Sequence, residues 1–245
     1  MSIRSDLAPA TAARAAGLSY LAMFALAMVA NFTVVERLVV PDDAALTLAN
    51  IQSDESAFRL GLAGFVLIAA LDLVIAWALH VLLRSTGEAR SLLAAWLRLG
   101  YSAVLVGATA FMAIAVEVAT GPVAAGVDDA TRASLTSVAM VGFDAAWMIG
   151  LVVFGLHLIV VGRILVGASL SRALGVVLSA AGVMYVADTF AHLVLTDYAS
   201  IADVMLVAVA VPSMVGEMWL AIWLLARAPR ALAALPAREP ELVPA

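Results

Sequence analysis

Six long apolar segments alternate along the chain with short stretches rich in charged residues, glycine or proline. The apolar segments cover residues 18–40, 58–83, 91–120, 135–161, 174–195 and 202–226. Each reaches the length of about 20 residues that a helix needs to cross the hydrocarbon core of a bilayer. Because backbone polar groups cannot stay unpaired in lipid, all six segments are predicted to be helices. The pattern therefore predicts an all-α, polytopic membrane protein with six transmembrane helices in one bundle.

The segments outside the six spans are too short for a soluble domain. Residues 1–17 form a leading segment, and residues 227–245 form a tail whose final ten residues include three prolines and predict disorder. The longest loop, residues 41–57, is expected to contain a short amphipathic helix near residues 44–51. Within the last span, Pro212 removes one backbone hydrogen bond, so a kink is expected there.

The arginines are distributed unevenly between the two sides of the predicted bundle. With the N-terminus inside, nine arginines lie in the inner segments, namely Arg4, Arg14, Arg84, Arg90, Arg163, Arg172, Arg227, Arg230 and Arg238. The outer segments contain only Arg37, Arg59 and Arg132. Because positive residues concentrate on the cytoplasmic side of membrane proteins, both termini are predicted to be cytoplasmic. All thirteen basic residues are arginine, and with the abundant alanine this favours a bacterial source and hence a bacterial inner membrane.

The composition excludes several classes of protein. Hydrophobic residues make up 65% of the chain and charged residues 13%, whereas ordinary globular domains have about 45–50% and about 25%. A chain with a mean hydropathy of +1.09 cannot cover itself with polar surface, which excludes a soluble enzyme. A sequence pI near 5.1 offers no basic face for a nucleic acid. The absence of cysteine excludes disulfides and thiolate metal sites.

Ionisable side chains inside the spans are the candidate functional residues. Each costs roughly 2.5–3.5 kcal/mol at the bilayer centre on insertion scales, so such groups face the bundle interior and find partners. They are Asp72, Arg98, Asp144, His157, Asp188 and Glu217, with His80 and His192 nearer the helix ends. Arg98 is the only arginine deep inside a span. Because Asp72 and Glu217 lie at a similar depth on other helices, Arg98 is expected to form an ion pair with one of them.

Helical spacing groups some of these residues. Tyr185, Asp188 and His192 fall on one face of the fifth span, at positions i, i+3 and i+7. Asp144 and His157 are thirteen residues apart on the fourth span and point to nearly opposite faces. The predicted ligand-binding residues are Asp72, Arg98, His157, Asp188, Glu217 and Tyr185.

The leading hypothesis is a polar pocket inside the membrane that binds or moves a small molecule, a lipid or a proton. Such a site needs ionisable groups at membrane depth and a broken helix, and the sequence contains both. The expected partners are the bilayer and the small ligand, and no cofactor is expected. Six spans are few for a transporter, so a homo-oligomer is expected if the protein transports its ligand.

Two alternatives stay open. An intramembrane enzyme is less favoured, because the three histidines lie at different depths and cannot hold one metal together. The remaining possibilities for an enzyme are a metal-dependent hydrolase using Asp144, Asp188 and His192, or a haem oxidoreductase using His80 and His157. The second alternative is a structural or partner-binding subunit whose buried charges hold the bundle together.

Several short strings, taken in order, resemble those of a bacterial integral membrane family catalogued as domain of unknown function 4386. They lie at residues 14–21, 41–44, 58–61, 154–158, 185–190 and 216–217, followed by residues 223–225. The resemblance extends from about residue 14 to residue 226 and rests on the order and spacing of the strings. It implies a six-helix membrane protein without an established activity, and it marks Arg59, Asp72, His157, Asp188 and Glu217 as the family positions.

Overall fold

The structure is a computed structural model that describes residues 9–234. Its elements are α1 (Pro9–Ala27), the π-helix η1 (Met28–Val35), α2 (Glu36–Leu38), α3 (Ala44–Ser53), α4 (Glu55–Leu83), η2 (Arg84–Thr86), α5 (Glu88–Thr120), η3 (Pro122–Ala124), α6 (Asp129–Gly167), α7 (Arg172–Val194), η4 (Tyr198–Ser200), α8 (Ala202–Ala226) and α9 (Ala228–Ala233). The described part of the chain contains no β-strand, so the all-α prediction is confirmed.

Six of these helical segments are long and apolar enough to cross a membrane. They are Pro9–Leu38, Glu55–Thr86, Glu88–Thr120, Asp129–Gly167, Arg172–Val194 and Ala202–Ala226, and they contain 23 to 39 residues each. Every predicted span falls on one of them, which indicates a multi-pass membrane protein. The first crossing consists of α1, η1 and α2 joined end to end, a subdivision that the sequence pattern does not predict.

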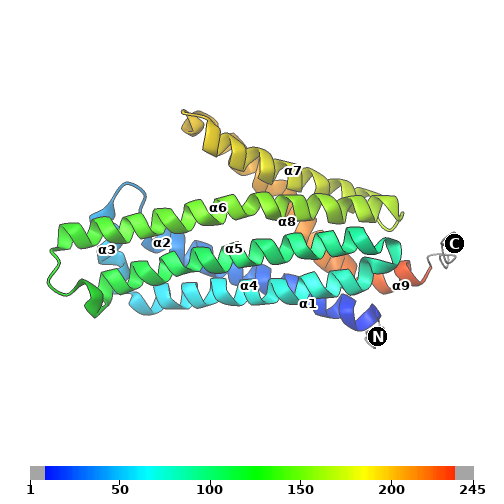
Figure 1. Cartoon of the computed structure of the whole chain (residues 1–245), viewed down its shortest axis with the longest axis horizontal. Coiled ribbons are helices and arrows are strands. Elements are labelled where there is room, and N and C mark those ends of the chain that lie inside the picture. Colours follow the sequence, from blue (N-terminus) through cyan, green and yellow to red (C-terminus); the bar gives the residue numbers. More distant parts are fainter. Residues whose placement is uncertain (1–8, 235–245) are drawn as a thin grey trace, which may run out of the picture.

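The six crossings form a closed ring. Along the ring, α1 packs against α4, α4 against α5, α5 against α6, α6 against α7, and α7 against α8, which returns to α1. In Figure 1, α4, α5 and α6 run side by side over most of their length, whereas α7 leans away from α6 toward its C-terminal end. The N-terminal end of α1 and the short helix α9 lie at the same end of the bundle.

Three helices, α3, α4 and α6, begin at aspartate caps. Asp43, Asp54 and Asp128 accept hydrogen bonds from the backbone N–H groups of Leu46, Ala57 and Thr131, at 2.9, 3.2 and 3.0 Å. Such bonds satisfy amide groups that have no partner in the first turn of a helix. They explain why α4 and α6 begin before the apolar runs do, and why the predicted short helix near residues 44–51 forms as α3.

Helical structure extends beyond both ends of the predicted transmembrane region. Residues 9–17 already belong to α1, because Ala12, Ala13 and Ala16 are fully buried against neighbouring helices. The tail was expected to be disordered from residue 227, yet its first part forms α9, and Ala228 is fully buried. The rest of the predicted disordered tail, residues 235–245, lies outside the described residues, as do residues 1–8.

Glycines set the distance between α6 and α7. Gly155 and Gly162 on α6 face Gly182 and Gly175 on α7, and on each helix the two glycines are seven residues, or two turns, apart. A Cβ atom added to Gly155 would lie 2.6 Å from the carbonyl oxygen of Gly182, so the backbones touch. Small residues allow this approach in membranes, where close packing replaces the hydrophobic effect as the force between helices.

We predict that the substitution Gly155→Ala destabilises the protein because the new methyl group has no room beside the backbone of α7. The expected loss is about 1–3 kcal/mol, as for other overpacked sites. The measurement is thermal unfolding in detergent. Gly107→Ala on α5 is the matched control: nothing lies within 4 Å of its added Cβ, so it should be neutral or stabilising by about 0.5–1 kcal/mol. Equal melting temperatures for the two variants would contradict the close helix contact.

Candidate functional site

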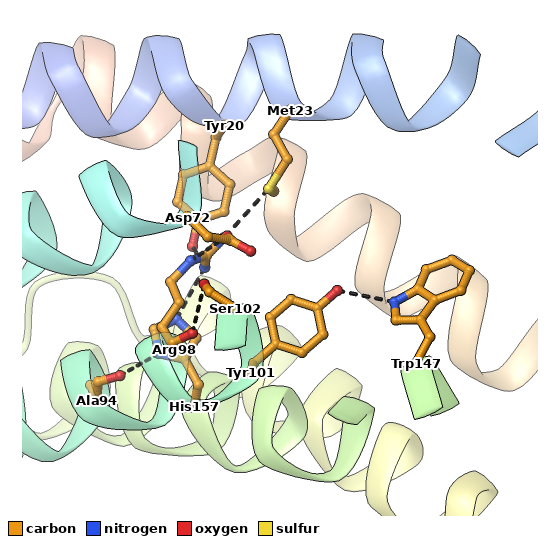
Figure 2. Close-up of polar contacts among 9 residues, drawn as sticks. All are labelled: Tyr20, Met23, Asp72, Ala94, Arg98, Tyr101, Ser102, Trp147 and His157. Atoms are coloured by element: carbon orange, nitrogen blue, oxygen red, sulfur yellow. Dashed lines mark hydrogen bonds and ion pairs between the residues drawn. The ribbon is translucent and has the colours of Figure 1, made fainter. Parts of the chain in front are cut away.

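Arg98, on α5, lies at the centre of the bundle with no exposed surface. Its Nε donates a hydrogen bond to Oδ1 of Asp72 on α4 at 2.7 Å, and its Nη2 pairs with the same oxygen at 2.5 Å. Its Nη1 donates to the hydroxyl oxygen of Tyr20 on α1 at 2.6 Å. Figure 2 shows these side chains converging on the guanidinium group. The expected ion pair therefore forms with Asp72 and not with Glu217.

Aromatic rings and a methionine sulfur also contact the guanidinium group of Arg98. The guanidinium carbon lies 4.7 Å from the ring centre of Tyr20 and 5.4 Å from that of Phe154. The sulfur of Met23 lies 3.6 Å from Nη2 and is a weak acceptor. We call Arg98, Asp72, Tyr20 and His157 the arginine cluster. Because a charge buried in a bundle is tolerated only when it is paired and hydrogen-bonded, this cluster holds α1, α4, α5 and α6 together.

His157, on α6, belongs to the arginine cluster, and its two ring nitrogens have distinct partners. Nδ1 lies 2.8 Å from the carbonyl oxygen of Ala94, which can only accept, so Nδ1 carries the proton. Nε2 lies 3.2 Å from Nη1 of Arg98, which can only donate, so Nε2 is the acceptor. This assignment by hydrogen-bond partners gives a neutral imidazole. With both nitrogens engaged and the ring fully buried, His157 has no free atom for a metal or haem iron.

The other ligands considered for the metal and haem sites do not come together as a site. His80 shares a hydrogen bond of 3.0 Å with Ser91 through its Nδ1. Among the described residues, no three histidine or acidic side chains lie close enough together to hold a metal. Asp144 and His192 both line a cavity of about 400 Å³ between α6 and α7. Asp188, the third ligand considered for a hydrolase, is engaged elsewhere.

Asp188 does not lie with the other predicted ligand-binding residues. Its Oδ1 accepts a hydrogen bond of 2.6 Å from the hydroxyl of Tyr198, in the turn between α7 and α8. The ring of His192 packs on Tyr198 with 4.4 Å between the ring centres. Burial, and then the bond and charge of Asp188, raise the pKa of Tyr198 to about 12, so its hydroxyl stays protonated and donates. The residues expected to share one face of α7 thus separate: Asp188 faces this turn and Tyr185 faces the bundle interior.

Two adjoining cavities occupy the interior of the ring, and we call them together the central chamber. Their volumes are about 230 and 120 Å³. Both are lined by Met23, Ala27, Asn31, Trp147, Tyr185 and Glu217. The sequence analysis assigns Tyr185 and Glu217 to a pocket, but it does not identify Trp147 or the residues of α1. The sequence pattern does not distinguish the apolar and aromatic side chains that line a cavity from those that fill the core.

Of the described residues that line the central chamber, Glu217 on α8 is the only acidic one, and none is basic. Within the described part of the chain its carboxylate accepts no hydrogen bond and forms no ion pair within 4 Å. Asn31 is the second strongly polar group and donates from Nδ2 to Glu36 at 3.0 Å. Tyr101, which lines the smaller cavity, accepts a hydrogen bond of 3.1 Å from Nε1 of Trp147 (Figure 2).

The larger cavity extends between α1 and α8 to the outside of the ring. Its lining includes Met28, Phe32 and Met214, whose side chains are 38%, 51% and 46% exposed. In a bundle that spans a membrane, such exposed apolar side chains face lipid. The central chamber is therefore open sideways toward the bilayer, at the point where α1 and α8 close the ring.

The two helices beside this opening both have an irregular backbone. In the first crossing, η1 (Met28–Val35) is a π-helix. π-Helices are rare in proteins, but those that occur are often found at functional sites. In α8, Pro212 has no N–H to donate to the carbonyl oxygen of Ala208. The hydroxyl of the next residue, Ser213, donates to the carbonyl oxygens of Val209 and Ala210, at 2.7 and 3.1 Å. The assigned helix continues through Pro212. Both irregular segments lie against the central chamber.

Comparison with known proteins gives one match. The family model described as Domain of unknown function (DUF4386) matches residues 15–228 of the chain. No curated protein and no solved structure matches it.

We predict that Asp72→Asn destabilises the protein strongly, because it leaves the buried guanidinium of Arg98 without a counter-charge. Removing one member of a buried ion pair costs about 3–5 kcal/mol in other proteins. Arg37→Gln removes the exposed ion pair of Arg37 with Asp54, which is 2.6 Å long, and should change stability little, because exposed pairs contribute little. The measurement is thermal unfolding in detergent. Similar melting temperatures for the two variants would show that Arg98 does not hold the bundle together.

Proposed function

We propose that this chain, which belongs to the DUF4386 family, binds a small cationic molecule with an apolar body inside the membrane. The observation that carries the proposal is Glu217, a carboxylate without a hydrogen bond that lines a cavity containing no basic residue. Of the ligands expected from the sequence, which are a small molecule, a lipid or a proton, the proposal selects one chemical class, a cation with an apolar body.

The charges around the central chamber favour a cation. Arg98 and Asp72 neutralise each other and are fully buried behind the chamber wall. His157 is neutral because its two ring nitrogens serve one donor and one acceptor. Glu217 is thus the one acidic or basic group, among the described residues that line the chamber, without a partner in the protein. In a medium of low dielectric constant, a bound cation is the strongest available partner for such a carboxylate.

The walls of the central chamber suit an ammonium or other cationic head group. Tyr20, Phe24, Phe32, Trp147 and Tyr185 line the larger cavity, and aromatic faces attract cations through their quadrupole. Asn31 and Ser213 add hydrogen-bonding groups at the same cavity. One carboxylate and several aromatic rings attract a cation by its charge alone. The ligand therefore does not need N–H groups in a fixed geometry.

The remaining wall suits an apolar body that enters from the bilayer. Met23, Met28, Met214 and Met218 line the larger cavity. Methionine side chains are flexible and polarisable, so they adapt to apolar groups of different shapes. Because the opening between α1 and α8 faces lipid, a ligand dissolved in the membrane reaches the chamber without crossing water.

Movement of the ligand is a second step of the same proposal. The π-helix η1 and the segment around Pro212 flank the opening, and such interruptions allow two halves of a helix to move separately. Opening and closing by these two segments would release the ligand to either leaflet. The homo-oligomer expected for a transporter of this size belongs to this part of the proposal.

A structural role is supported for the arginine cluster, but not for the central chamber. The donors of Arg98 toward Asp72, Tyr20 and His157 are all engaged inside the protein. Of the six predicted ligand-binding residues, Asp72, Arg98 and His157 therefore act as supports, while Tyr185 and Glu217 are proposed to touch the ligand. Asp188 is proposed to fix the turn between α7 and α8 through Tyr198.

The membrane and the orientation are also proposed. The nine arginines counted on one side against three on the other support cytoplasmic termini in a bacterial inner membrane. In the structure, the N-terminal end of α1 and helix α9 lie at one end of the bundle, in agreement with an even number of crossings (Figure 1).

We predict that the protein in detergent retains hexyltrimethylammonium in native mass spectrometry, and retains hexanol and hexyl sulfate far less. These probes share a chain length and differ in charge, so they separate a cation site from a merely apolar cavity. Glu217→Gln should weaken retention of the cation at least tenfold, because the amide removes the counter-charge and keeps the shape. The mass of any molecule that copurifies from the native membrane should belong to the same cationic class.

The control variant is Asp203→Asn, which neutralises an acid on the same helix. Asp203 lies in the first turn of α8 and does not line the central chamber. Retention equal to that of the unmodified protein is expected for this variant. If Glu217→Gln keeps full affinity while the protein stays folded, or if hexyl sulfate binds as well as the cation, the proposed function is wrong.

A further inference from the structure

A groove on the outside of the ring, separate from the central chamber, is formed by α5, α6 and α7. Its volume is about 930 Å³. Its lining consists of Arg90, Leu93, Val160, Arg163, Val166, Gly167, Val176, Ser179, Ala180, Val183 and Met184. No residue is shared with the central chamber, so this inference does not depend on the proposed function.

One end of the groove is positively charged. Arg90 lies in the first turn of α5, and Arg163 lies in the last turns of α6, so both are near helix ends at the same end of the bundle. None of the lining residues that the structure describes is acidic. Within the described residues, neither arginine forms an ion pair. Both side chains are exposed. Their two positive charges therefore have no counter-charge from residues 9–234.

Arg90 is directed toward α6. Its Nη2 donates a hydrogen bond of 3.3 Å to the carbonyl oxygen of Thr86. Its Nη1 lies 3.7 Å from the position of a Cβ atom added to Gly167, the last residue of α6. Because Gly167 has no side chain, the guanidinium group of Arg90 fits over the end of α6. The same helix carries Arg163.

Apart from Ser179, whose hydroxyl donates to the carbonyl oxygen of Gly175 at 2.8 Å, the described residues along the rest of the groove are apolar, and the groove leads away from the charged end. Along α7 it is lined from Val176 to Met184, a distance of roughly 12 Å at the rise of a helix. Leu93, Val176 and Val183 are 50%, 60% and 52% exposed. The groove therefore combines a positive site at the helix ends with an apolar channel that runs toward the middle of the membrane.

We propose that this groove binds one anionic glycerophospholipid, with its phosphate between Arg90 and Arg163 and one acyl chain along α7. Charge complementarity selects the occupant: the groove carries two arginines, no acid and an apolar continuation at bilayer depth. Arginine binds phosphate oxygens through charge-assisted hydrogen bonds, and basic pockets between transmembrane helices bind anionic head groups. A zwitterionic lipid has the same phosphate, but its cationic head group is repelled by the arginine pair.

The test is native mass spectrometry of the full chain in detergent, titrated with phosphatidylglycerol or with phosphatidylcholine of the same acyl chains. The unmodified protein should retain phosphatidylglycerol at least tenfold more tightly than phosphatidylcholine. The double variant R90Q/R163Q should lose this preference. The control R230Q removes an exposed arginine of α9, at the same end of the bundle but outside the groove, and should keep it.

A second variant keeps both arginines and fills the apolar channel. Ala180 is exposed in the groove, so A180W adds a large side chain there without disturbing the core. Weaker retention of phosphatidylglycerol by folded A180W would support the assignment of the acyl chain. The proposal is overturned if R90Q/R163Q and A180W both bind phosphatidylglycerol like the unmodified protein. It is also overturned if R230Q loses as much affinity as R90Q/R163Q, since net charge alone would then explain binding.

Discussion

The need to keep the charge of Arg98 paired away from water determines the arrangement of most of the bundle. An unpaired guanidinium at this depth would cost several kcal/mol, so the helices around it must present acceptors at fixed positions. α4 supplies the carboxylate of Asp72, α1 supplies the hydroxyl of Tyr20, and α6 supplies Nε2 of His157. His157 also donates a hydrogen bond from Nδ1 to the carbonyl oxygen of Ala94, which lies on α5 like Arg98. Four of the six crossings are thereby fixed in rotation and depth.

The other two crossings are held differently, and this difference creates the central chamber. α7 is attached to α6 by the contact of Gly155 with Gly182 and of Gly162 with Gly175, and it leans away beyond that contact (Figure 1). Among the described residues, no hydrogen bond or ion pair joins α8 to the arginine cluster. Glu217, its acidic residue at this depth, forms no ion pair with Arg98 within 4 Å. The ring therefore has a well-packed side and a looser side. The loose side contains the cavity, the carboxyl group of Glu217 and Pro212, and the π-helix η1 of the first crossing borders it.

The sequence is sufficient to predict the fold class and the six crossings, because apolar length alone decides them. It also narrows the partner of Arg98 to two acids of similar depth, since charge and helical rise are readable from spacing. It could not choose between Asp72 and Glu217, because the choice depends on the rotation of each helix about its axis. The position of Asp188 was not predictable either, as its partner Tyr198 lies in a turn beyond the apolar run. The π-helix and the facing glycines depend on contacts between helices, which periodicity within one helix does not contain.

The central claim is that Arg98 is neutralised by Asp72 and that the charge of Glu217 is left for a ligand. Two double-mutant cycles for the free energy of unfolding test it most directly: Asp72→Asn with Arg98→Gln, and Glu217→Gln with Arg98→Gln. Residues in direct contact show coupling of about 0.5–3 kcal/mol, and residues without a shared contact add nearly independently. The account predicts coupling of about 2 kcal/mol or more for the first pair, which is joined by hydrogen bonds. It predicts a smaller coupling for the second pair, whose charges interact without a direct contact. A larger coupling for Glu217 with Arg98 would contradict it, because the carboxylate would then belong to the arginine cluster and not to the central chamber.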